Sequence, residues 1–328
     1  MALLGRDRRG CHRNVSSAWS TTFQFAVASD RSTRLRASIR LNVSVVNDHS
    51  AITPGKRRAR NAHPDFEVIL DSQSVHQGKV ALITGGSRGI GFAIAEELIK
   101  GGARVMITGR REDVLEAAAS KLGEHCRWRA CPVDDEKKAK ECVDATLQTF
   151  GRLDVLVNNA GISPQWGPMV TVDARLARKF ADANIWAPLM WISLTFDAWM
   201  KEHRGAVLNI TSVGGELPTP NIGYYNTTKA ALGFMTRQLA AELAPMVRVN
   251  AIAPGLVETD MMAAIPEDER RALLAEIPMG RFGKPEEIAV AAAFLVSEHA
   301  AWLTGQVIAI DGGALVTTGL PKTSHERN

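Results

Sequence analysis

The chain has 328 residues, of which 45% are hydrophobic and 23% charged, and its formal net charge is +4. One large α/β domain with a terminal extension fits this length better than two domains, since such folds run to about 250 residues as one unit. Residues 1–60 hold 12 Lys and Arg against Asp7, Asp30 and Asp48, which leaves 27 basic and 32 acidic residues, a net charge of −5, for residues 61–328. This balance argues against nucleic-acid binding by the main domain. No apolar run approaches the roughly 18 residues of a membrane-spanning helix.

Four cysteines, Cys11, Cys126, Cys131 and Cys142, are spread along the chain. They form no C-x-x-C pair and have no histidine cluster beside them. Metal and disulfide sites depend on such spacings. We therefore expect small, buried, reduced thiols and no metal site.

The N-terminal residues 1–75 are rich in Arg and Ser and poor in acids. This composition is typical of an organelle transit peptide, and the early arginines leave no apolar region for a secretory signal. A plastid or mitochondrial location would follow. A disordered basic extension or a misassigned start codon, with a cytoplasmic location, is the alternative. We expect a disordered extension over 1–75, a folded domain over 76–316 and a tail over 317–328.

From Lys79 onward, short apolar runs alternate with amphipathic helical patterns. Runs that are apolar throughout are typical of strands covered on both faces. Their alternation with helices predicts an α/β fold, a single doubly wound Rossmann-type domain with a parallel sheet. The candidate strands span residues 79–86, 103–110, 126–133, 153–161, 206–212, 247–255 and 307–313.

The first candidate strand runs into a glycine-rich turn over residues 84–91, which opens a helix. A pyrophosphate needs backbone N–H groups and a close approach that Cβ atoms would block, and a helix N-terminus favours its negative charge. The spacing T-G-x-x-x-G-x-G differs from the G-x-G-x-x-G fingerprint, and a packing turn is the alternative. The turn predicts a dinucleotide site with contacts from Gly85, Ser87, Arg88, Gly89, Ile90 and Gly91.

The second candidate strand ends at Gly109 and is followed by Arg110 and Arg111. NAD-dependent enzymes place an Asp or Glu about 20 residues past the glycines, on the ribose 2′-hydroxyl, and Gly109 stands at that position here. Arginine suits a 2′-phosphate because its planar guanidinium can bind two oxygens at once. Arg110 and Arg111, with Arg88, predict NADPH, and NADH is the alternative. A solvated surface position is the other interpretation of Arg111.

Tyr225 and Lys229 are spaced Y-x-x-x-K, which puts both side chains on one helix face, one turn apart. The chain has two tyrosines, and Tyr224 has Thr228 at the same spacing, so it cannot make such a pair. A free phenol has a pKa of about 10 and is a poor acid–base group near neutrality. A nearby ammonium stabilises the phenolate, so Lys229 is predicted to lower the pKa of Tyr225 and to make it a general acid for carbonyl reduction.

These motifs together resemble those of the short-chain dehydrogenase/reductase family, over residues 76–316. The resemblance is carried by the glycine turn, by Asn158-Asn159-Ala160-Gly161, and by Ser212 together with the Tyr225–Lys229 pair. Ser212 lies thirteen residues before Tyr225. It implies a seven-stranded sheet and a nicotinamide cofactor that carries the hydride. The segments PGLVETDM and GRFGKPEEIA resemble those of bacterial 3-oxoacyl-carrier-protein reductases, and they recur in many carbonyl and alcohol dehydrogenases.

The resemblance also implies roles for single residues. The catalytic set would be Asn184, Ser212, Tyr225 and Lys229. Ser212 would donate a hydrogen bond to the substrate oxygen, Lys229 would also bind the nicotinamide ribose, and Asn184 would hold a water that leads to bulk solvent. An ordinary polar helix residue is the alternative for Asn184. Implied cofactor contacts are Val133, Asn159, Ala160, Gly161, Tyr225, Lys229, Pro254, Gly255, Val257 and Thr259. One departure is Pro132, which replaces the family's adenine-contacting Asp unless Asp134 stands in for it.

The predicted substrate pocket is apolar, with candidate walls at Trp166, Leu217, Pro218, Met261 and Met262. We expect NADPH-dependent reduction of a ketone to a secondary alcohol, with a 3-oxoacyl thioester as one candidate substrate. The alternatives are an NAD(P)-dependent alcohol or polyol dehydrogenase and a nucleotide-binding protein without catalysis. The resemblance implies a homotetramer or dimer formed by the helix of Tyr225 and the helix before it.

Overall fold

The computed structural model describes residues 20–28, 36–44, 74–162, 166–259 and 267–317. It divides into two units, Met1–Asp71 and Ser72–Asn328. In the first unit, β1 (Ser20–Ala28) pairs antiparallel with β2 (Arg36–Ser44). We had expected no regular structure in this extension, and the alternation of Phe23, Phe25 and Val27 with other residues is the signal that could have predicted β1. The rest of the extension lies outside the described residues.

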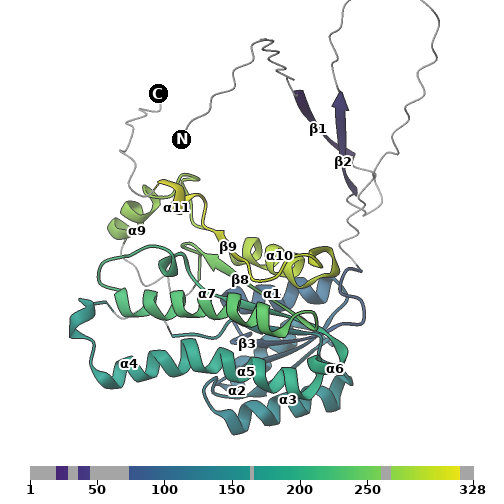
Figure 1. Ribbon diagram of the computed structural model, residues 1–328, viewed down its shortest axis with the longest axis vertical. Helices are drawn as coiled ribbons and strands as arrows, with labels where there is room; N and C mark the ends of the chain where they lie inside the picture. Colours follow the sequence, from purple (N-terminus) through teal and green to yellow (C-terminus); the bar gives the residue numbers. More distant parts are fainter. Residues whose placement is uncertain (1–19, 29–35, 45–73, 163–165, 260–266, 318–328) are drawn as a thin grey trace, which may run out of the picture. The chain divides into compact units, whose positions relative to one another are not determined.

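The second unit is built on a seven-stranded sheet in the order β5-β4-β3-β6-β7-β8-β9 (Figure 1). Every neighbouring pair is parallel. The predicted doubly wound α/β domain is confirmed, and each candidate strand is present in a shorter form. The strands are β3 (Val80–Thr84), β4 (Arg104–Gly109), β5 (Cys126–Ala130), β6 (Val155–Asn158), β7 (Gly205–Ile210), β8 (Val247–Pro254) and β9 (Val307–Ile310).

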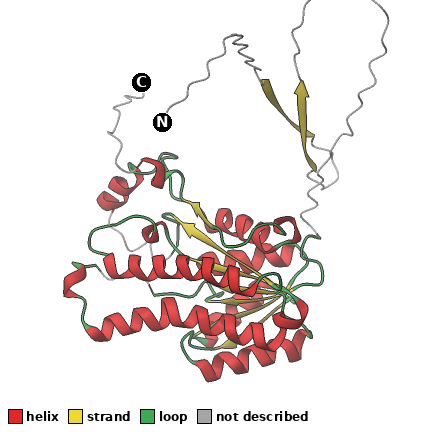
Figure 2. Cartoon of the chain, in the orientation of Figure 1, coloured by secondary structure: helices red, strands yellow, loops and turns green. Residues whose placement is uncertain are grey.

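Helices cover both faces of this sheet (Figure 2). Alternate residues of β3 show the two layers: Ala81 and Ile83 belong to one apolar cluster, Val80 and Leu82 to the other. The first cluster is completed by α1 (Gly89–Lys100), α2 (Glu112–Leu122) and α10 (Pro285–Val296). The second is completed by α3 (Glu136–Phe150), α5 (Ala187–Thr195) and α7 (Gly223–Leu243).

Shorter helices connect these elements. They are α4 (Ala174–Ala181), α6 (Lys201–His203), α9 (Glu267–Leu274) and α11 (Ala314–Thr317), the π-helical turns η2 (Asp182–Trp186) and η3 (Phe196–Met200), and the 3₁₀ turns η1 (Met169–Thr171), η4 (Val213–Gly215) and η5 (Glu298–Ala300). Among the described residues, no helix has the length and apolar character that a membrane crossing requires.

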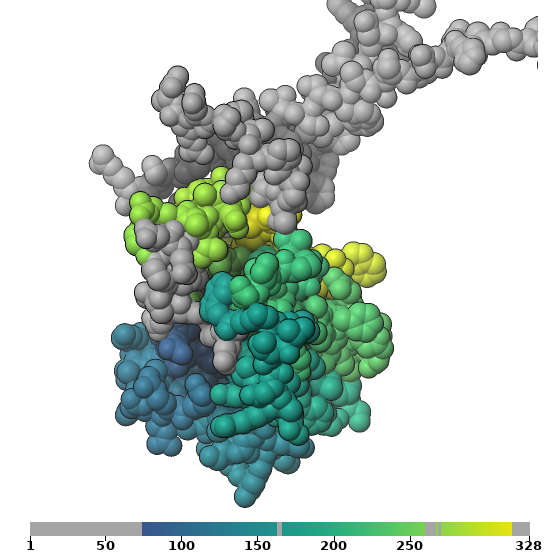
Figure 3. Space-filling view, turned by 90° about the vertical axis from the view of Figure 1, so that its left-hand side faces the viewer, coloured from purple at the N-terminus to yellow at the C-terminus, as the bar shows by residue number. Residues whose placement is uncertain are grey.

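The strand order reverses at β3, which lies between β4 and β6. In open α/β sheets, ligands bind beyond the carboxyl ends of the strands at such a switch point. The loops after β3, β6, β7 and β8 therefore gather the residues of a site. Figure 3 looks onto one side of the molecule, where the blue segment that begins with β3 lies beside the teal and green segments that follow β6 and β7.

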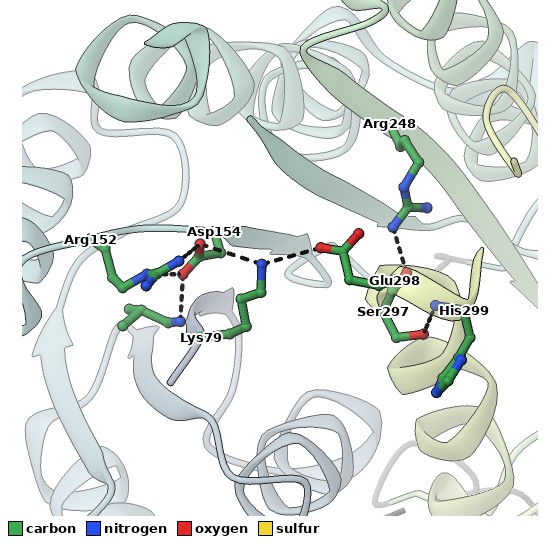
Figure 4. Close-up of polar contacts among 8 residues, drawn as sticks. Lys79, Arg152, Asp154, Arg248, Ser297, Glu298 and His299 are labelled. Carbon is green, nitrogen blue, oxygen red and sulfur yellow. Dashed lines mark hydrogen bonds and ion pairs between the residues drawn. The ribbon is translucent and has the colours of Figure 1, made fainter. Parts of the chain in front are cut away.

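Charged residues tie the amino ends of the strands together (Figure 4). Asp154, just before β6, accepts hydrogen bonds from Arg152 at 2.8 and 2.6 Å and from the backbone N–H of Val80 at 2.9 Å. The Lys79 ammonium lies 4.0 Å from Asp154 and 3.2 Å from Glu298. Asp154 is 6% exposed, so its charge is held by partners rather than by water.

We expect Asp154→Asn to destabilise the fold by about 1–3 kcal/mol, because an amide leaves the Arg152 charge without its counter-ion and can only partly accept from Val80. The free energy of unfolding in urea measures this. Asp144→Asn is the matched control, since Asp144 pairs with Lys140 on the exposed face of α3 at 2.8 Å. That exposed pair contributes less than about 1 kcal/mol, so equal losses in the two variants would contradict the assignment.

The three described cysteines are buried free thiols, as predicted. Burial raises the pKa of Cys126 and of Cys142 to about 12 and that of Cys131 to about 11. Such thiols carry almost no thiolate near neutral pH and are inert as nucleophiles. Cys11 lies outside the described residues.

Candidate active site

The glycine-rich turn joins β3 to α1 and is braced by the end of β6. Gly85 and Gly89 have φ values of +64° and +54°, which favour glycine. The Asn159 side-chain amide donates to the carbonyls of Thr84 and Gly85, both at 3.0 Å. A Cβ at Gly91 would overlap that amide. The side-chain amide of Asn159, a predicted cofactor contact, therefore holds the turn in place.

Thr84 completes this brace. Its hydroxyl oxygen accepts hydrogen bonds from the backbone N–H groups of Asn159 and Ala160, each at 3.1 Å. Arg88 occupies the N-cap position of α1, and Ile90 packs against the first apolar cluster. The turn thus presents backbone at the start of α1, where an anionic group would meet N–H groups and the positive end of the helix dipole.

The carboxyl end of β4 lies beside the same turn. A Cβ at Gly109 would lie 3.8 Å from the Ser87 hydroxyl oxygen, so a side chain at this position would reach the turn. Because residue 109 is glycine, it places no carboxylate there. Arg110 and Arg111 follow and are exposed, with Arg111 at the N-cap of α2. The arginines predicted for a 2′-phosphate therefore flank the place where an NAD enzyme would carry its acid.

The next acids along the chain have a local structural role. Glu112 and Asp113 fall in the first turn of α2, as predicted, where negative charge stabilises the helix dipole.

The strand end after β5 shows which acid caps the next helix. Asp135 is the N-cap of α3 and accepts from the backbone N–H of Lys138 at 3.0 Å, whereas Asp134 is exposed. Val133 is half-buried, and its carbonyl accepts a 2.9 Å hydrogen bond from the Trp191 indole. Val133 is thus held at the rim of the sheet by α5.

Tyr225, Lys229 and Ser212 come together at the carboxyl end of β7. Tyr225 and Lys229 lie on α7, with the Lys229 ammonium 5.8 Å from the centre of the Tyr225 ring. Ser212 directly precedes η4, and its side chain acts to lower the pKa of Tyr225. Lys229 is 6% exposed and donates to the carbonyl of Ile210 at 2.9 Å. The predicted grouping of these three side chains is what the fold produces.

The charge states of this pair differ from the expectation. Burial raises the pKa of Tyr225, and the lowering influence comes from the Ser212 hydrogen bond rather than from Lys229. The reason is that Lys229 is itself buried, which lowers its pKa to about 8, and that its ammonium is engaged by Ile210. The structure does not show the predicted lowering of the Tyr225 pKa by Lys229, because burial raises that pKa.

Asn184 lies in the π-helical turn η2 and is 1% exposed. Its side-chain oxygen accepts from the backbone N–H of Ile162 at 2.9 Å, and its amide donates to the Thr228 hydroxyl at 3.1 Å. Short π-helical segments often mark functional sites. A Cβ at Gly161 would lie 3.1 Å from the Asn184 side-chain oxygen and 3.5 Å from the Lys229 ammonium, so the glycine lets this loop approach both residues.

The segment after β8 reaches the glycine turn. Pro254 ends β8, and a Cβ at Gly255 would lie 2.8 Å from the backbone of Asp311. Val257 is buried and forms an isolated parallel β-bridge with Gly283. The Thr259 methyl lies 3.3 Å from the position of a Cβ on Gly89. The predicted Pro254–Thr259 contacts thus lie along one path toward the phosphate turn.

The proposed pocket walls lie on two linked loops. Trp166 is 66% exposed, Leu217 is half-buried and Pro218 is exposed. The backbone N–H of Gly167 donates to the carbonyl of Asn221 at 2.9 Å, which joins the loop after β6 to the loop after β7. Met261 and Met262 lie outside the described residues.

Sequence reasoning missed three polar residues that support this site. Thr84 holds the loop after β6. Thr228 donates to the carbonyl of Tyr225 at 2.7 Å and accepts from Asn184. Asn226 is 6% exposed beside Tyr225. For Asn226 and Thr228, the available signal was their position as polar residues inside the Y-x-x-x-K spacing.

Comparison with known proteins places this geometry in a family. A family model described as "Enoyl-(Acyl carrier protein) reductase" matches residues 85–314. The 3-oxoacyl-[acyl-carrier-protein] reductase FabG of Vibrio cholerae is 38% identical over 247 residues, which cover 72% of this chain and 97% of the relative. The 3alpha-hydroxysteroid dehydrogenase of Mediterraneibacter gnavus is 35% identical over 244 residues, with 73% and 97% covered.

A mammalian relative has the same extent. Dehydrogenase/reductase SDR family member 4 of Bos taurus is 34% identical over 243 residues, which cover 72% of this chain and 87% of the relative. The parallel seven-stranded sheet, the glycine turn at its switch point and the matches to these relatives agree over the same residues. The chain belongs to the short-chain dehydrogenase/reductase family of NAD(P)-dependent oxidoreductases that act on CH–OH groups.

Proposed function

We propose that this protein reduces a ketone to a secondary alcohol with NADPH, and that Tyr225 is its general acid. The observation that carries the proposal is the grouping around Tyr225: the Lys229 ammonium lies 5.8 Å from the centre of its ring, and the Ser212 side chain acts to lower its pKa. This grouping lies at the carboxyl end of β7, on the same edge of the sheet as the glycine turn. A carbonyl carbon placed there would have a proton donor for its oxygen.

The residues present fit a nicotinamide dinucleotide. Gly85, Gly89 and Gly91 let the turn pack closely against Ala160, Thr259 and Asn159, and the N-terminus of α1 favours a pyrophosphate. The cofactor supplies the hydride when bound. Ser87 and Arg110 would hold its adenosine end, and Val257 and Thr259 would hold the nicotinamide side.

The chain's own residues supply the proton chemistry. The Tyr225 hydroxyl gives its proton to the carbonyl oxygen as negative charge develops there, and the Ser212 hydroxyl holds the same oxygen. Burial keeps Tyr225 protonated because it raises the pKa. Burial lowers the pKa of Lys229 to about 8, and its ammonium lies 5.8 Å from the centre of the ring that becomes the phenolate. Asn184 accepts from the backbone N–H of Ile162 and donates to Thr228, the residue before Lys229 on α7.

The substrate class rests on the pocket walls and on the relatives. Trp166, Leu217 and Pro218 offer apolar surface, and one relative's name states a 3-oxoacyl-[acyl-carrier-protein] substrate. We therefore propose a 3-oxoacyl thioester. The hydroxysteroid dehydrogenase relative favours a second candidate, NAD(P)-dependent oxidation of an alcohol. Initial rates of NADPH oxidation with acetoacetyl thioesters, diketones, simple ketones and 3-oxosteroids measure reduction, and rates of NADP⁺ reduction with an alcohol measure oxidation. A higher rate with NADP⁺ and an alcohol than with NADPH and every ketone would reject reduction.

We expect Arg110→Ala to raise the KM for NADPH by roughly 10–100-fold and to change the KM for NADH by less than about twofold. A charge-assisted hydrogen bond to the 2′-phosphate contributes about 1.5–3 kcal/mol, which converts to that range. Steady-state kinetics with each cofactor measure the effect. Arg127→Ala is the matched control, because Arg127 is exposed near the amino end of β5. Equal changes in both KM values would refute the role of Arg110.

A further inference from the structure

The turn that follows Ser212 lies directly against α7. A Cβ at Gly214 would overlap the side-chain amide of Asn226. A Cβ at Gly215 would lie 2.9 Å from the backbone N of Ala230. The two glycines of η4 thus contact α7 at one residue after Tyr225 and again one turn later. Nothing bulkier than glycine fits between the turn and the helix.

Asn226 is held in this contact at an energetic cost. It is 6% exposed, and its amide donates to the Leu217 carbonyl at 3.4 Å, a long hydrogen bond. Its side-chain oxygen is buried and has no hydrogen-bond partner. Leaving a buried acceptor unpaired is unfavourable, and an apolar side chain of the same size would avoid this. Asn226 thus keeps a polar side chain whose buried oxygen has no hydrogen-bond partner, and this side chain contacts Gly214. This combination points to a role beyond stability.

The contacts close a ring around the proposed proton donor. The Ser212 hydroxyl oxygen accepts from the backbone N–H of Gly214 at 3.1 Å, and the Ser212 side chain acts to lower the pKa of Tyr225. Gly214 packs on Asn226, which is the next residue along α7 from Tyr225. Displacement of the η4 turn would therefore move the Ser212 hydroxyl relative to the phenol.

We propose that Asn226 is a positioning residue, which clamps the Ser212–Leu217 segment on α7 and so sets the Ser212 hydroxyl against that of Tyr225. This inference rests on the proposed function only for its effect on turnover. Its structural part, the alignment of two side chains, can be measured without any substrate. Lys229 faces Tyr225 from α7 and Ser212 faces it from the end of β7; both groups are kept in every variant below.

The test uses the small number of tyrosines. The chain has two, so Tyr224→Phe leaves Tyr225 as the single titrating phenol, and the tyrosinate ultraviolet difference spectrum then reports its pKa. In this background we expect Asn226→Ala to raise the Tyr225 pKa by about half a unit to one unit, the size of one neutral hydrogen bond. Thr227→Ala is the matched control: Thr227 is adjacent and exposed, and bonds only its own helix at Gly223. It should leave the pKa unchanged.

Turnover gives the second readout. Asn226→Ala should lower kcat about tenfold, as a small misplacement of catalytic groups does, leave the KM for NADPH unchanged and move the alkaline limb of kcat upward with the phenol pKa. Gly214→Ala should have the same effects, and these should be smaller when Asn226→Ala is also present, because the overlap is then removed.

An unchanged phenol pKa and an unchanged kcat in Asn226→Ala overturn the proposal. If circular dichroism shows that this variant does not fold, Asn226→Ser takes its place, since serine keeps a polar group but is too short to reach Leu217, and the same two outcomes decide. If the parent protein reduces no ketone, the proposed function fails, yet the titration still accepts or rejects the positioning role.

Discussion

Tyr225→Phe should lower kcat for ketone reduction by about 10²–10⁴-fold, the usual contribution of a positioned general acid. The ring is retained, so the packing around it should be preserved while the proton donor is lost. Cofactor affinity, measured by quenching of tryptophan fluorescence, should stay within about twofold because the glycine turn and Arg110 are untouched. The loss should appear in kcat rather than in the KM for NADPH.

Tyr224→Phe is the control for that measurement. Tyr224 lies next to Tyr225 on α7 and makes an edge-on contact with the Phe180 ring, 6.1 Å between centroids. Phenylalanine keeps this contact, so activity should remain close to that of the parent. Retained turnover in Tyr225→Phe, or an equal loss in both variants, would show that the phenol of Tyr225 is not the acid.

Gly91→Ala should destabilise the protein and weaken cofactor binding, against the usual trend. Inside a helix, alanine is favoured over glycine by about 1 kcal/mol. At Gly91 the added Cβ would overlap the Asn159 amide, which holds Thr84 and Gly85. Moving that amide removes the brace of the phosphate turn. We expect a net loss of about 1–3 kcal/mol in the free energy of unfolding and a Kd for NADPH at least about tenfold higher.

Gly233→Ala isolates this effect from helix propensity. Gly233 is buried in the interior of α7, and the nearest atom to an added Cβ is a Val307 methyl at 3.8 Å, an ordinary contact. That variant should be neutral or more stable by up to about 1 kcal/mol. If urea denaturation shows the same sign for both variants, the overlap with Asn159 is not what keeps residue 91 a glycine.

Much of the fold could be predicted because its signals are local. Most of the strands in the sheet are short and largely apolar, as sheets covered on both faces require, and the strand β3 is buried along its whole length. The glycine turn and the spacing of Tyr225 and Lys229 depend on neighbours in the sequence, so they also survive in the structure. The strands β1 and β2, which we did not predict, lie in a basic segment with few acidic residues. That composition is typical of a disordered extension, whereas the period-two alternation of the same segment is typical of strands.

The parts that could not be predicted depend on burial and on contacts across the sequence. The Asn159 amide donates to the carbonyl of Gly85, 74 positions away, which the place of Asn159 at the end of a strand does not predict. The rise in the Tyr225 pKa and the fall in that of Lys229 follow from desolvation, which a spacing does not report. Asn226 has no motif of its own, and only its contact with Gly214 shows where it acts.

The most direct test of ketone reduction follows the hydride. With NADPH deuterated at the transferred position and an acetoacetyl thioester, mass spectrometry should find a 3-hydroxyacyl product with one deuterium on the carbinol carbon, and none above background with Tyr225→Phe. A crotonyl thioester, the substrate that an enoyl reductase would saturate, should give no labelled product. Deuterium in a saturated acyl thioester, with the ketone unreduced, would contradict the central claim.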